Sequence, residues 1–350
     1  MAAPAHGTLL GMARPRTVTI RDVAALAGVS AGTVSKALNG RGSLRADTVA
    51  RVREAAERLD FRPDPAARSL HDGRTYTVGM ITTDTIGRFS IPLLIGAEDT
   101  LGAGQISVLL CDARDDPIRE RHHLRVLLGR RVDGIIVTGR RAGTRPSLGA
   151  DLGVPVVYAF LASADPRDCS VVPDEAGGAA LAADHLRTAG RQRIAHITGP
   201  EHHHSARVRA EAVTGRLAAD GTGLVTPVLY GAWSEAWGRQ GTGILLAQGV
   251  GFDAVVCGND QIARGAADAL REAGRAVPRE VALTGFDNWD VMTLASRPPL
   301  TSIDMDLEGL GRVAAGFLLK AIDGDPAPGV HTHPPKLVVR DSTAAAAAGP

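Results

Sequence analysis

The chain has 350 residues, of which 44% are hydrophobic and 22% charged, and its formal net charge is +1. This length favours two or three domains, and this composition is typical of globular rather than disordered proteins. No run of apolar residues approaches the roughly 18 that a membrane span needs, and the first 16 residues lack the pattern of a secretory signal. We therefore expect no membrane association.

The cysteines indicate the redox environment of the protein, and the distribution of charge indicates which part of the chain could bind phosphate. Cys111, Cys169 and Cys257 are few and far apart, which argues against a disulfide framework or a zinc knuckle and favours a reducing, cytoplasmic environment. Residues 1–72 carry 11 Arg and Lys against 7 Asp and Glu, whereas the remainder carries 28 against 31. The basic excess lies in the first part of the chain, where phosphate binding would require it.

After a flexible arm over residues 1–16, residues 19–39 have the pattern of two short helices joined by a turn. The first helix is expected from about Arg21 to Ala27, and Gly28 supplies the backbone freedom for the turn. Ser30 stands where it can cap the second helix. Apolar residues at helical spacing face inward, which leaves an outer face that consists of Ala31, Gly32, Ser35, Lys36 and Asn39. The pattern predicts a helix-turn-helix whose second helix fits a DNA major groove.

A third helix is expected from Thr48, because Val49, Val52, Ala56 and Leu59 recur at helical spacing. Two prolines end it, and a short helix-forming segment with one exposed leucine, Leu70, follows. The sequence thus predicts a DNA-binding domain over residues 17–62 and a linker over 63–74.

From Thr77 onward, short apolar runs alternate with helical stretches. Strands are expected at 78–81, 108–110, 134–137, 154–158, 170–172, 194–198, 228–230, 254–257 and 281–286. Helices are expected near 92–103, 117–129, 175–189, 207–219, 235–248, 260–273 and 305–321. This alternation predicts an α/β fold with parallel sheets and helices on both faces, and nine strands suit two lobes better than one sheet. Residues 344–350 are low in complexity and are expected to be a disordered tail.

Several motifs now stand in a recognisable order. They include Val18–Ala24, Ala27–Ser30 and Thr33–Ser35 near the start, Pro65–Leu70 in the linker, and Arg131–Val137, Gly258–Asp260, Leu283–Asn288 and Pro299–Ile303 beyond it. Over residues 18–343 the chain resembles the lac-repressor/purine-repressor (LacI/GalR) family of bacterial transcription regulators.

The resemblance implies an all-α helix-turn-helix headpiece, a hinge helix, and a two-lobed domain like periplasmic sugar-binding proteins over residues 75–343. The first lobe would comprise about 75–172 and 302–328, and the second about 173–301 and 329–343. It implies a homodimer on near-palindromic double-stranded operator DNA, switched by a small molecule that is most simply a sugar. It implies no cofactor and no catalysis.

The resemblance places base-facing side chains at Ala31, Gly32 and Lys36. Lys36 can donate to guanine, or it can contact a phosphate. Arg68 falls in the hinge helix and belongs to the DNA-binding set, together with candidates for phosphate contact at Thr19, Ser30, Thr33, Ser35 and Asn39. Ser30 has the alternative role of a helix cap.

Leu70 matches the family's leucine that enters the minor groove at the operator centre and opens a base step. The alternative is a linker leucine packed on the next domain.

A ligand would lie between the lobes, against loops at the carboxyl ends of strands. Asp287 would accept hydroxyls of a sugar, unless it caps a turn, and Trp233 would stack on a ring, unless it is structural. The full set of expected ligand contacts is Asp84, Phe89, Ser90, His203, Ser205, Arg209, Trp233, Asn259 and Asp287. Ser90 stands where a second aromatic often sits, which argues against a two-sided ring sandwich. His202–His204 suggests a hydrogen bond to ligand from His203 rather than a metal site.

Two other functions remain open at this point. A periplasmic solute-binding protein would fit the two lobes, but not the headpiece or the absent signal sequence. An α/β enzyme is disfavoured because the chain lacks a phosphate loop, a Gly-x-Ser-x-Gly elbow and a His-Glu-x-x-His motif.

Overall fold

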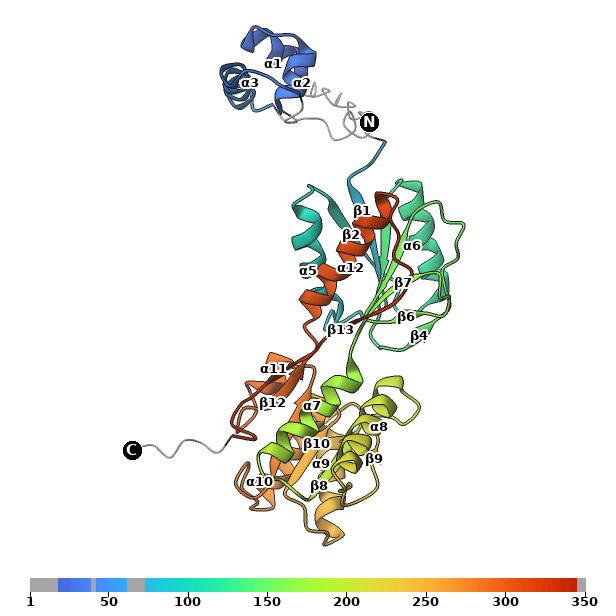
Figure 1. Cartoon of the computed structure of the whole chain (residues 1–350), viewed down its shortest axis with the longest axis vertical. Helices are drawn as coiled ribbons and strands as arrows, with labels where there is room; N and C mark the ends of the chain where they lie inside the picture. The colour runs from blue at the N-terminus through green and yellow to red at the C-terminus, as the bar shows by residue number, and fades with distance from the viewer. Residues whose placement is uncertain (1–17, 39–41, 62–72, 345–350) are drawn as a thin grey trace, which may run out of the picture. The chain divides into compact units, whose positions relative to one another are not determined.

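A computed structural model describes residues 18–38, 42–61 and 73–344 of the chain (Figure 1). The chain divides between Thr75 and Tyr76 into two compact units, called here the headpiece and the two-lobed unit. None of the helices in these described ranges has the length and apolarity to cross a membrane.

The described part of the headpiece is a bundle of three helices. They are α1 (Ile20–Ala27), α2 (Ala31–Leu38) and α3 (Ala46–Arg58). One fully buried valine from each helix, Val23, Val34 and Val52, meets the others in a core completed by small alanines. The expected apolar spacing therefore forms a closed core, and α3 begins two residues before its expected start.

The first lobe of the two-lobed unit contains a six-stranded parallel sheet in the order β13-β7-β5-β3-β1-β2. The strands are β1 (Thr77–Thr82), β2 (Ser107–Asp112), β3 (Gly134–Val137), β5 (Val156–Ala159), β7 (Cys169–Pro173) and β13 (Gly329–His333). A separate small sheet pairs β4 (Thr144–Arg145) with β6 (Ala162–Ser163). The helices of this lobe are α5 (Ser90–Gly102), α6 (Pro117–Gly129) and α12 (Leu307–Ile322).

The second lobe repeats this plan with the strand order β14-β12-β11-β10-β8-β9. The strands are β8 (Ile194–Thr198), β9 (Leu229–Tyr230), β10 (Ala254–Cys257), β11 (Ala282–Phe286), β12 (Thr301–Asp304) and β14 (Lys336–Val338). All pair in parallel except β14, which runs antiparallel to β12. The helices are α7 (Glu175–Thr188), α8 (His204–Ala219), α9 (Glu235–Ala247), α10 (Asp260–Glu272) and α11 (Asp290–Thr293).

The lobe boundaries differ from the expected ones at two strands. Residues 302–304, which were expected in the first lobe, belong to strand β12, which was not among the expected strands and pairs with β11 in the second lobe, with Thr301 opposite Thr284. Residues 329–333, which were expected in the second lobe, form strand β13, which was also not expected and pairs with β7 in the first lobe, with Gly329 opposite Cys169. The chain therefore crosses between lobes after β7, after β12 and after β13. Sheet pairing between distant strands decides this, and local sequence does not encode it.

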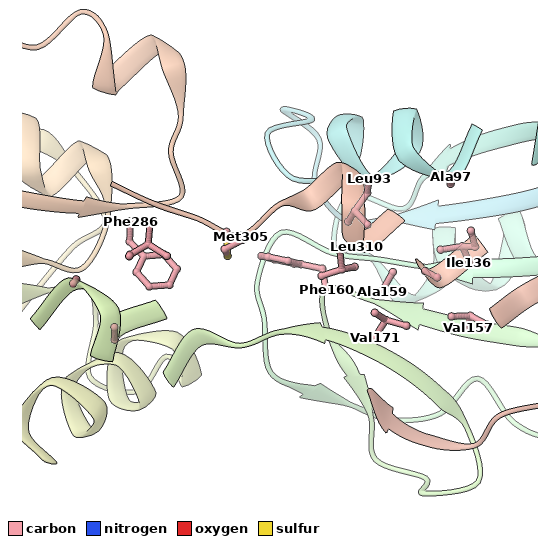
Figure 2. Packing of buried hydrophobic residues seen from close by; sticks show 14 of the residues in the cluster. Leu93, Ala97, Ile136, Val157, Ala159, Phe160, Val171, Phe286, Met305 and Leu310 are labelled. Carbon is pink, nitrogen blue, oxygen red and sulfur yellow. The ribbon is translucent and has the colours of Figure 1, made fainter. Parts of the chain in front are cut away.

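One apolar cluster reaches from one lobe into the other. Met305 lies on the segment that joins β12 to α12, with Phe286 on the side of the second lobe and Leu310 on the side of the first (Figure 2). Phe160, at 3% exposed, belongs to the same cluster. The segment that joins β12 to α12 is thus packed in a buried core, which gives the cleft between the two lobes defined walls.

Candidate functional sites

The turn between α1 and α2 is formed as its sequence indicates. Gly28 ends α1 in the left-handed conformation, with φ of 65°, and its N–H donates to the carbonyl of Ala24. The hydroxyl of Ser30 accepts from the N–H of Thr33 at 3.1 Å, so Ser30 caps α2. The expected alternative role of Ser30 is therefore present in the structure.

The expected DNA-contacting side chains are not equally free to reach a partner. Gly32 and Lys36 are exposed on α2, whereas Ala31 is half-buried and packs against the headpiece core rather than lying wholly on the outer face. Thr19 is held by Asp22, whose carboxylate accepts from the Thr19 hydroxyl at 2.7 Å and from its N–H at 2.8 Å. Thr33 and Ser35 are half-buried. Asn39, Arg68 and Leu70 lie outside the described residues.

A cavity of about 1040 Å³ lies between the lobes of the two-lobed unit. This volume is at the upper end of ordinary ligand pockets. Eight of the nine expected contact residues line it, namely Asp84, Phe89, His203, Ser205, Arg209, Trp233, Asn259 and Asp287. Ser90 does not, because it is buried at the start of α5, with its N–H and hydroxyl directed to Asp84.

Arg209 on α8 is buried and anchors the floor of this cavity. Its guanidinium donates to Glu175 Oε1 and to the carbonyl of Gly258, each at 2.6 Å, and lies 3.7 Å from Asp287 Oδ1. The ring of Phe286 lies 3.6 Å from the guanidinium carbon. A buried arginine that is paired and stacked in this way is held rigidly, so it presents a preorganised donor to the cavity.

Arg88 reaches across from the first lobe to the same carboxylate. It lies in the loop between β1 and α5, donates to Asp287 Oδ2, and donates to Gln261 Oε1 at 3.2 Å. Its guanidinium carbon lies 4.4 Å from the centre of the Trp289 ring. Asp287 and Gln261 belong to the second lobe, so Arg88 ties the two lobes together through ionic, polar and cation–π contacts.

Asp287 itself is strained and desolvated. Its φ of 97° is in the left-handed region that non-glycine residues seldom occupy, and such strain collects at functional sites. Burial raises the pKa of Asp287, while Arg88 and then Arg209 oppose that rise. Burial, and then the nearby charge of Asp287, raises the pKa of Asp260. Within the described residues the side chain of Asp287 caps no turn, and its carboxylate contacts Arg88 and Arg209.

Asp84 lines the cavity as expected, and its carboxylate also has a structural role. One of its carboxylate oxygens, Oδ2, accepts from the N–H groups of Phe89 and Ser90 at 2.7 and 2.9 Å, and so closes the loop that leads into α5. Asn259 is similar, because its Oδ1 accepts from the N–H of Ile262 at 2.9 Å and caps α10. Both residues line the cavity, but in each of them one side-chain oxygen already accepts a hydrogen bond from the backbone.

Aromatic rings form the cavity walls. Phe89 stacks on Phe160 with ring centres 4.8 Å apart, and Phe160 is held at a φ of 74°. On the other side the indole N–H of Trp233 donates to Nδ1 of His203 at 2.8 Å. This bond fits a neutral His203, and burial together with the charge of Arg141 lowers its pKa. Phe160 thus supplies a second aromatic that sequence reasoning had not found.

The cavity also contains polar residues that the motifs did not predict. Arg88 and Trp289 lie beside Asp287, and Arg140, Arg141, Arg207 and Gln261 also line the walls. Arg88 and Trp289 each stand within a few residues of an expected contact, which is the one local signal they carry. Among the described residues no group of three or more His, Cys, Asp or Glu is placed to hold a metal ion.

Comparison with known families matches both parts of the chain. Residues 19–64 match the family described as bacterial regulatory proteins, lacI family, and residues 183–343 match the periplasmic binding protein-like domain. The ribose operon repressor of Escherichia coli (strain K12) is 32% identical over 309 residues, which cover 87% of this chain and 93% of that protein. The HTH-type transcriptional repressor PurR of Aliivibrio fischeri (strain MJ11) is 30% identical over 331 residues, covering 93% and 98%.

Solved structures give the same answer for the fold. The lac repressor dimer bound to operator and the anti-inducer ONPF superposes with a TM-score of 0.72 at 26% identity, covering 94% of this chain and all of that chain. The complex of the transcriptional regulator CelR with cellobiose has a TM-score of 0.63 at 28% identity, with 94% and 100% covered. These likenesses extend through the headpiece and both lobes.

Proposed function

Since this chain belongs to the lacI family of bacterial regulatory proteins, we propose that it is a cytoplasmic transcriptional repressor whose affinity for operator DNA is changed by a sugar bound between its lobes. The exposed face of α2 supports the DNA-binding part, because Lys36 and the small Gly32 are exposed on the helix that would lie in a major groove. No step of this function requires catalysis or a cofactor.

The cavity supports a polyhydroxy ligand. Its floor offers fixed donors on Arg88 and Arg209 and the carboxylate of Asp287, and its walls offer the rings of Phe89 and Trp233. Donors and acceptors side by side suit pairs of hydroxyl groups, whereas aromatic rings suit the C–H face of a sugar ring. The solved CelR complex contains cellobiose, a neutral sugar, and the relative from Escherichia coli is a repressor of the ribose operon.

The Arg88–Asp287 contact carries this proposal, because the same ion pair lines the cavity and joins the two lobes. A ligand that takes hydrogen bonds from Arg88 or gives them to Asp287 must change how the lobes hold each other. Operator DNA and ligand then favour different lobe arrangements, and each changes the affinity for the other by the same coupling free energy.

The working form is proposed to be a homodimer. Helix α5 exposes Ile91 and Ile95, at 43% and 44%, four residues apart on one face. An exposed pair of this kind suits a two-fold interface, and two-fold symmetry matches one headpiece to each half of a near-palindrome. Sedimentation of wild type and of Ile95→Glu tests this, and a wild-type monomer would overturn it.

The linker over residues 63–74 is proposed to carry the coupling to DNA, with Leu70 inserted into the minor groove. Leu70→Ala is then expected to weaken operator binding by about tenfold or more, while ligand binding to the two-lobed unit is unchanged. If Leu70→Ala binds operator as tightly as wild type, the wedge is wrong.

The central experiment is operator release. DNA recovered by in vitro selection on the full chain would be labelled and titrated with protein, and a panel of sugars would be added at saturating operator. We expect one class of sugar to shift the binding curve, and Asp287→Asn to abolish that shift. A protein that selects no DNA sequence, or one whose DNA binding no ligand alters, would contradict the proposal.

A further inference from the structure

The charges along the cavity are unequal from one end to the other. Five arginines line it but only two carboxylates, Asp84 and Asp287. At the floor the charges are matched, because Arg88 pairs with Asp287 and Arg209 with Glu175. The excess of positive charge therefore lies elsewhere on the walls.

That excess is made by two arginines from opposite lobes. Arg141 follows β3 in the first lobe, and Arg207 lies in the first two turns of α8 in the second. Both are exposed, and neither makes an ion pair or side-chain hydrogen bond within the described residues. We call these two arginines, with the start of α8, the cationic rim.

The two sides of the rim approach each other. A Cβ placed on Gly143 would lie 3.4 Å from Cβ of His204, so the loop that carries Arg141 touches the start of α8. Helix α8 begins without a side-chain hydrogen bond from its N-cap residue, His203. The partial positive charge of the first turn adds to that of the arginines on the same side of the cavity.

The positive charge of the rim also affects the pKa of the neighbouring His203. Burial lowers the pKa of His203, and the charges of Arg141, His202 and Arg140 lower it further. Arg140 has a partner, since its guanidinium lies 2.8 Å from Asp115. After burial, the charge of Arg141 is thus the largest influence on the pKa of His203.

There is room beside the rim for a further group. A second cavity of about 380 Å³ shares the loop residues 140–144 with the larger one. Three carboxylates line this second cavity, and all have partners. Asp115 pairs with Arg140, Glu120 pairs with Arg145, and Asp116 caps α6. A substituent of the ligand can extend toward this space without meeting an unpaired carboxylate at those positions.

We propose that the ligand is an anionic sugar derivative, with its ring between the aromatic walls, its hydroxyls toward Asp287, and its phosphate or carboxylate bound by Arg141, Arg207 and the start of α8. This inference rests on the proposed sugar-binding function of the same cavity. A neutral sugar would leave both guanidinium groups without an anionic partner, whereas an anion can pair with the two arginines from opposite lobes. Guanidinium groups bind phosphate and carboxylate through two parallel hydrogen bonds.

The test compares neutral and charged forms of the same sugar on the full chain. Calorimetry and thermal shift would be run with ribose and ribose 5-phosphate, glucose and glucose 6-phosphate, glucuronate, and inorganic phosphate, at low and high salt. We expect at least one anionic probe to bind about tenfold or more tightly than its neutral parent, with an affinity that falls as salt rises. The phosphorylated sugars and glucuronate distinguish a phosphate from a carboxylate ligand.

Variants then locate the effect. The double change Arg141→Gln with Arg207→Gln is expected to reduce binding of the anionic probe by about tenfold or more and to leave the neutral parent within about twofold. Arg121→Gln with Arg279→Gln removes one exposed arginine from each lobe away from the cavity and is the charge-matched control. Equal losses in the two double variants would overturn the assignment to the rim.

The outcomes separate this inference from the proposed function. If a neutral sugar binds as tightly as its phosphate and releases operator, the regulatory function stands and the anionic ligand is wrong. If an anionic sugar binds through Arg141 and Arg207 but no operator binding is found, the ligand class stands and the regulatory function fails. If no probe binds, the anionic ligand is wrong, and the operator-release experiment alone decides the regulatory function.

Discussion

Arg88 and Asp287 are 199 residues apart in the chain and form an ion pair that joins the two lobes across the cavity. Their side chains are only 13% and 7% exposed, and Trp289 covers the guanidinium. The pair therefore lies in the cavity proposed to bind the ligand and connects the two lobes, and the first prediction concerns its strength.

Arg88→Ala leaves Asp287 buried with Arg209 as its remaining cation, at 3.7 Å. Removing one partner of a buried pair costs about 3 kcal/mol or somewhat more, because the other charge stays desolvated. We expect a loss of this size in urea unfolding, and a large part of it should be recovered when Asp287→Asn is added. Arg140→Ala is the matched control, since its partner Asp115 is 53% exposed and such pairs contribute about 1 kcal/mol or less. Equal losses for the two arginines would contradict the buried role of Arg88.

Lys36 and Ser30 should separate DNA contact from helix formation. Lys36→Ala removes an exposed donor from α2 and is expected to weaken operator binding by about ten- to a hundredfold with no change in the thermal midpoint. Ser30→Ala removes the cap at Thr33 and is expected to cost the headpiece about 1 kcal/mol. Fluorescence anisotropy and thermal unfolding measure the two effects. Arg53→Ala, which removes one exposed charge from α3, is the control, and an equal loss of specific binding there would argue against a base contact by Lys36.

His196 predicts a loss of stability in acid. It is fully buried in β8, one ring nitrogen contacts the carbonyl of Val256 at 2.8 Å, and the other has no partner in the structure. Burial lowers its pKa from 6.5 to about 4. Between these values the unfolded chain binds a proton that the folded chain does not, so the contribution is fully present above pH 6.5 and is lost as pH falls to about 4.

The raised pKa of Asp260 acts in the opposite direction, because its contribution is lost as pH rises. The measurement must therefore compare wild type with His196→Asn over the same pH range. The stability advantage of wild type is expected to narrow by on the order of 3 kcal/mol as pH falls through this window. Parallel stability curves for the two proteins would contradict the neutral, desolvated state of His196.

Two glycines on α12 test how closely the helices of the first lobe approach. A Cβ on Gly311 would lie 2.2 Å from the carbonyl oxygen of Leu93 on α5, whereas a Cβ on Gly316 would meet nothing within 4 Å. Gly311→Ala is expected to lower stability by about 1–3 kcal/mol through overpacking. Gly316→Ala is expected to raise it by up to about 1 kcal/mol, as alanine favours a helix. Calorimetric unfolding measures the two changes in stability. If both substitutions change stability in the same direction, helices α5 and α12 can move apart to accommodate the added methyl group.

The headpiece was predictable because its signals are local. Gly28 and Ser30 determine the turn and the cap through their own backbone and side-chain chemistry, and Val23, Val34 and Val52 each belong to an apolar face that recurs at helical spacing within its own helix. Most strands and helices of the two lobes were predicted for the same reason. The role of Asp84 was not, since an aspartate that caps a loop and one that binds a sugar look alike in sequence.

The sequence by itself determined the family, most of the order of elements and eight residues that line the cavity, because these depend on short-range spacing and on motifs. Only the tertiary structure decided that Arg88 pairs with Asp287 and that Phe160 stacks on Phe89. It also decided that β12 joins the sheet of the second lobe and β13 the sheet of the first. Each of these depends on which distant strands pair and on where the packed lobes bring their loops. The physical reason is that contacts between residues far apart in the chain are set by the whole fold and leave no local pattern in either partner.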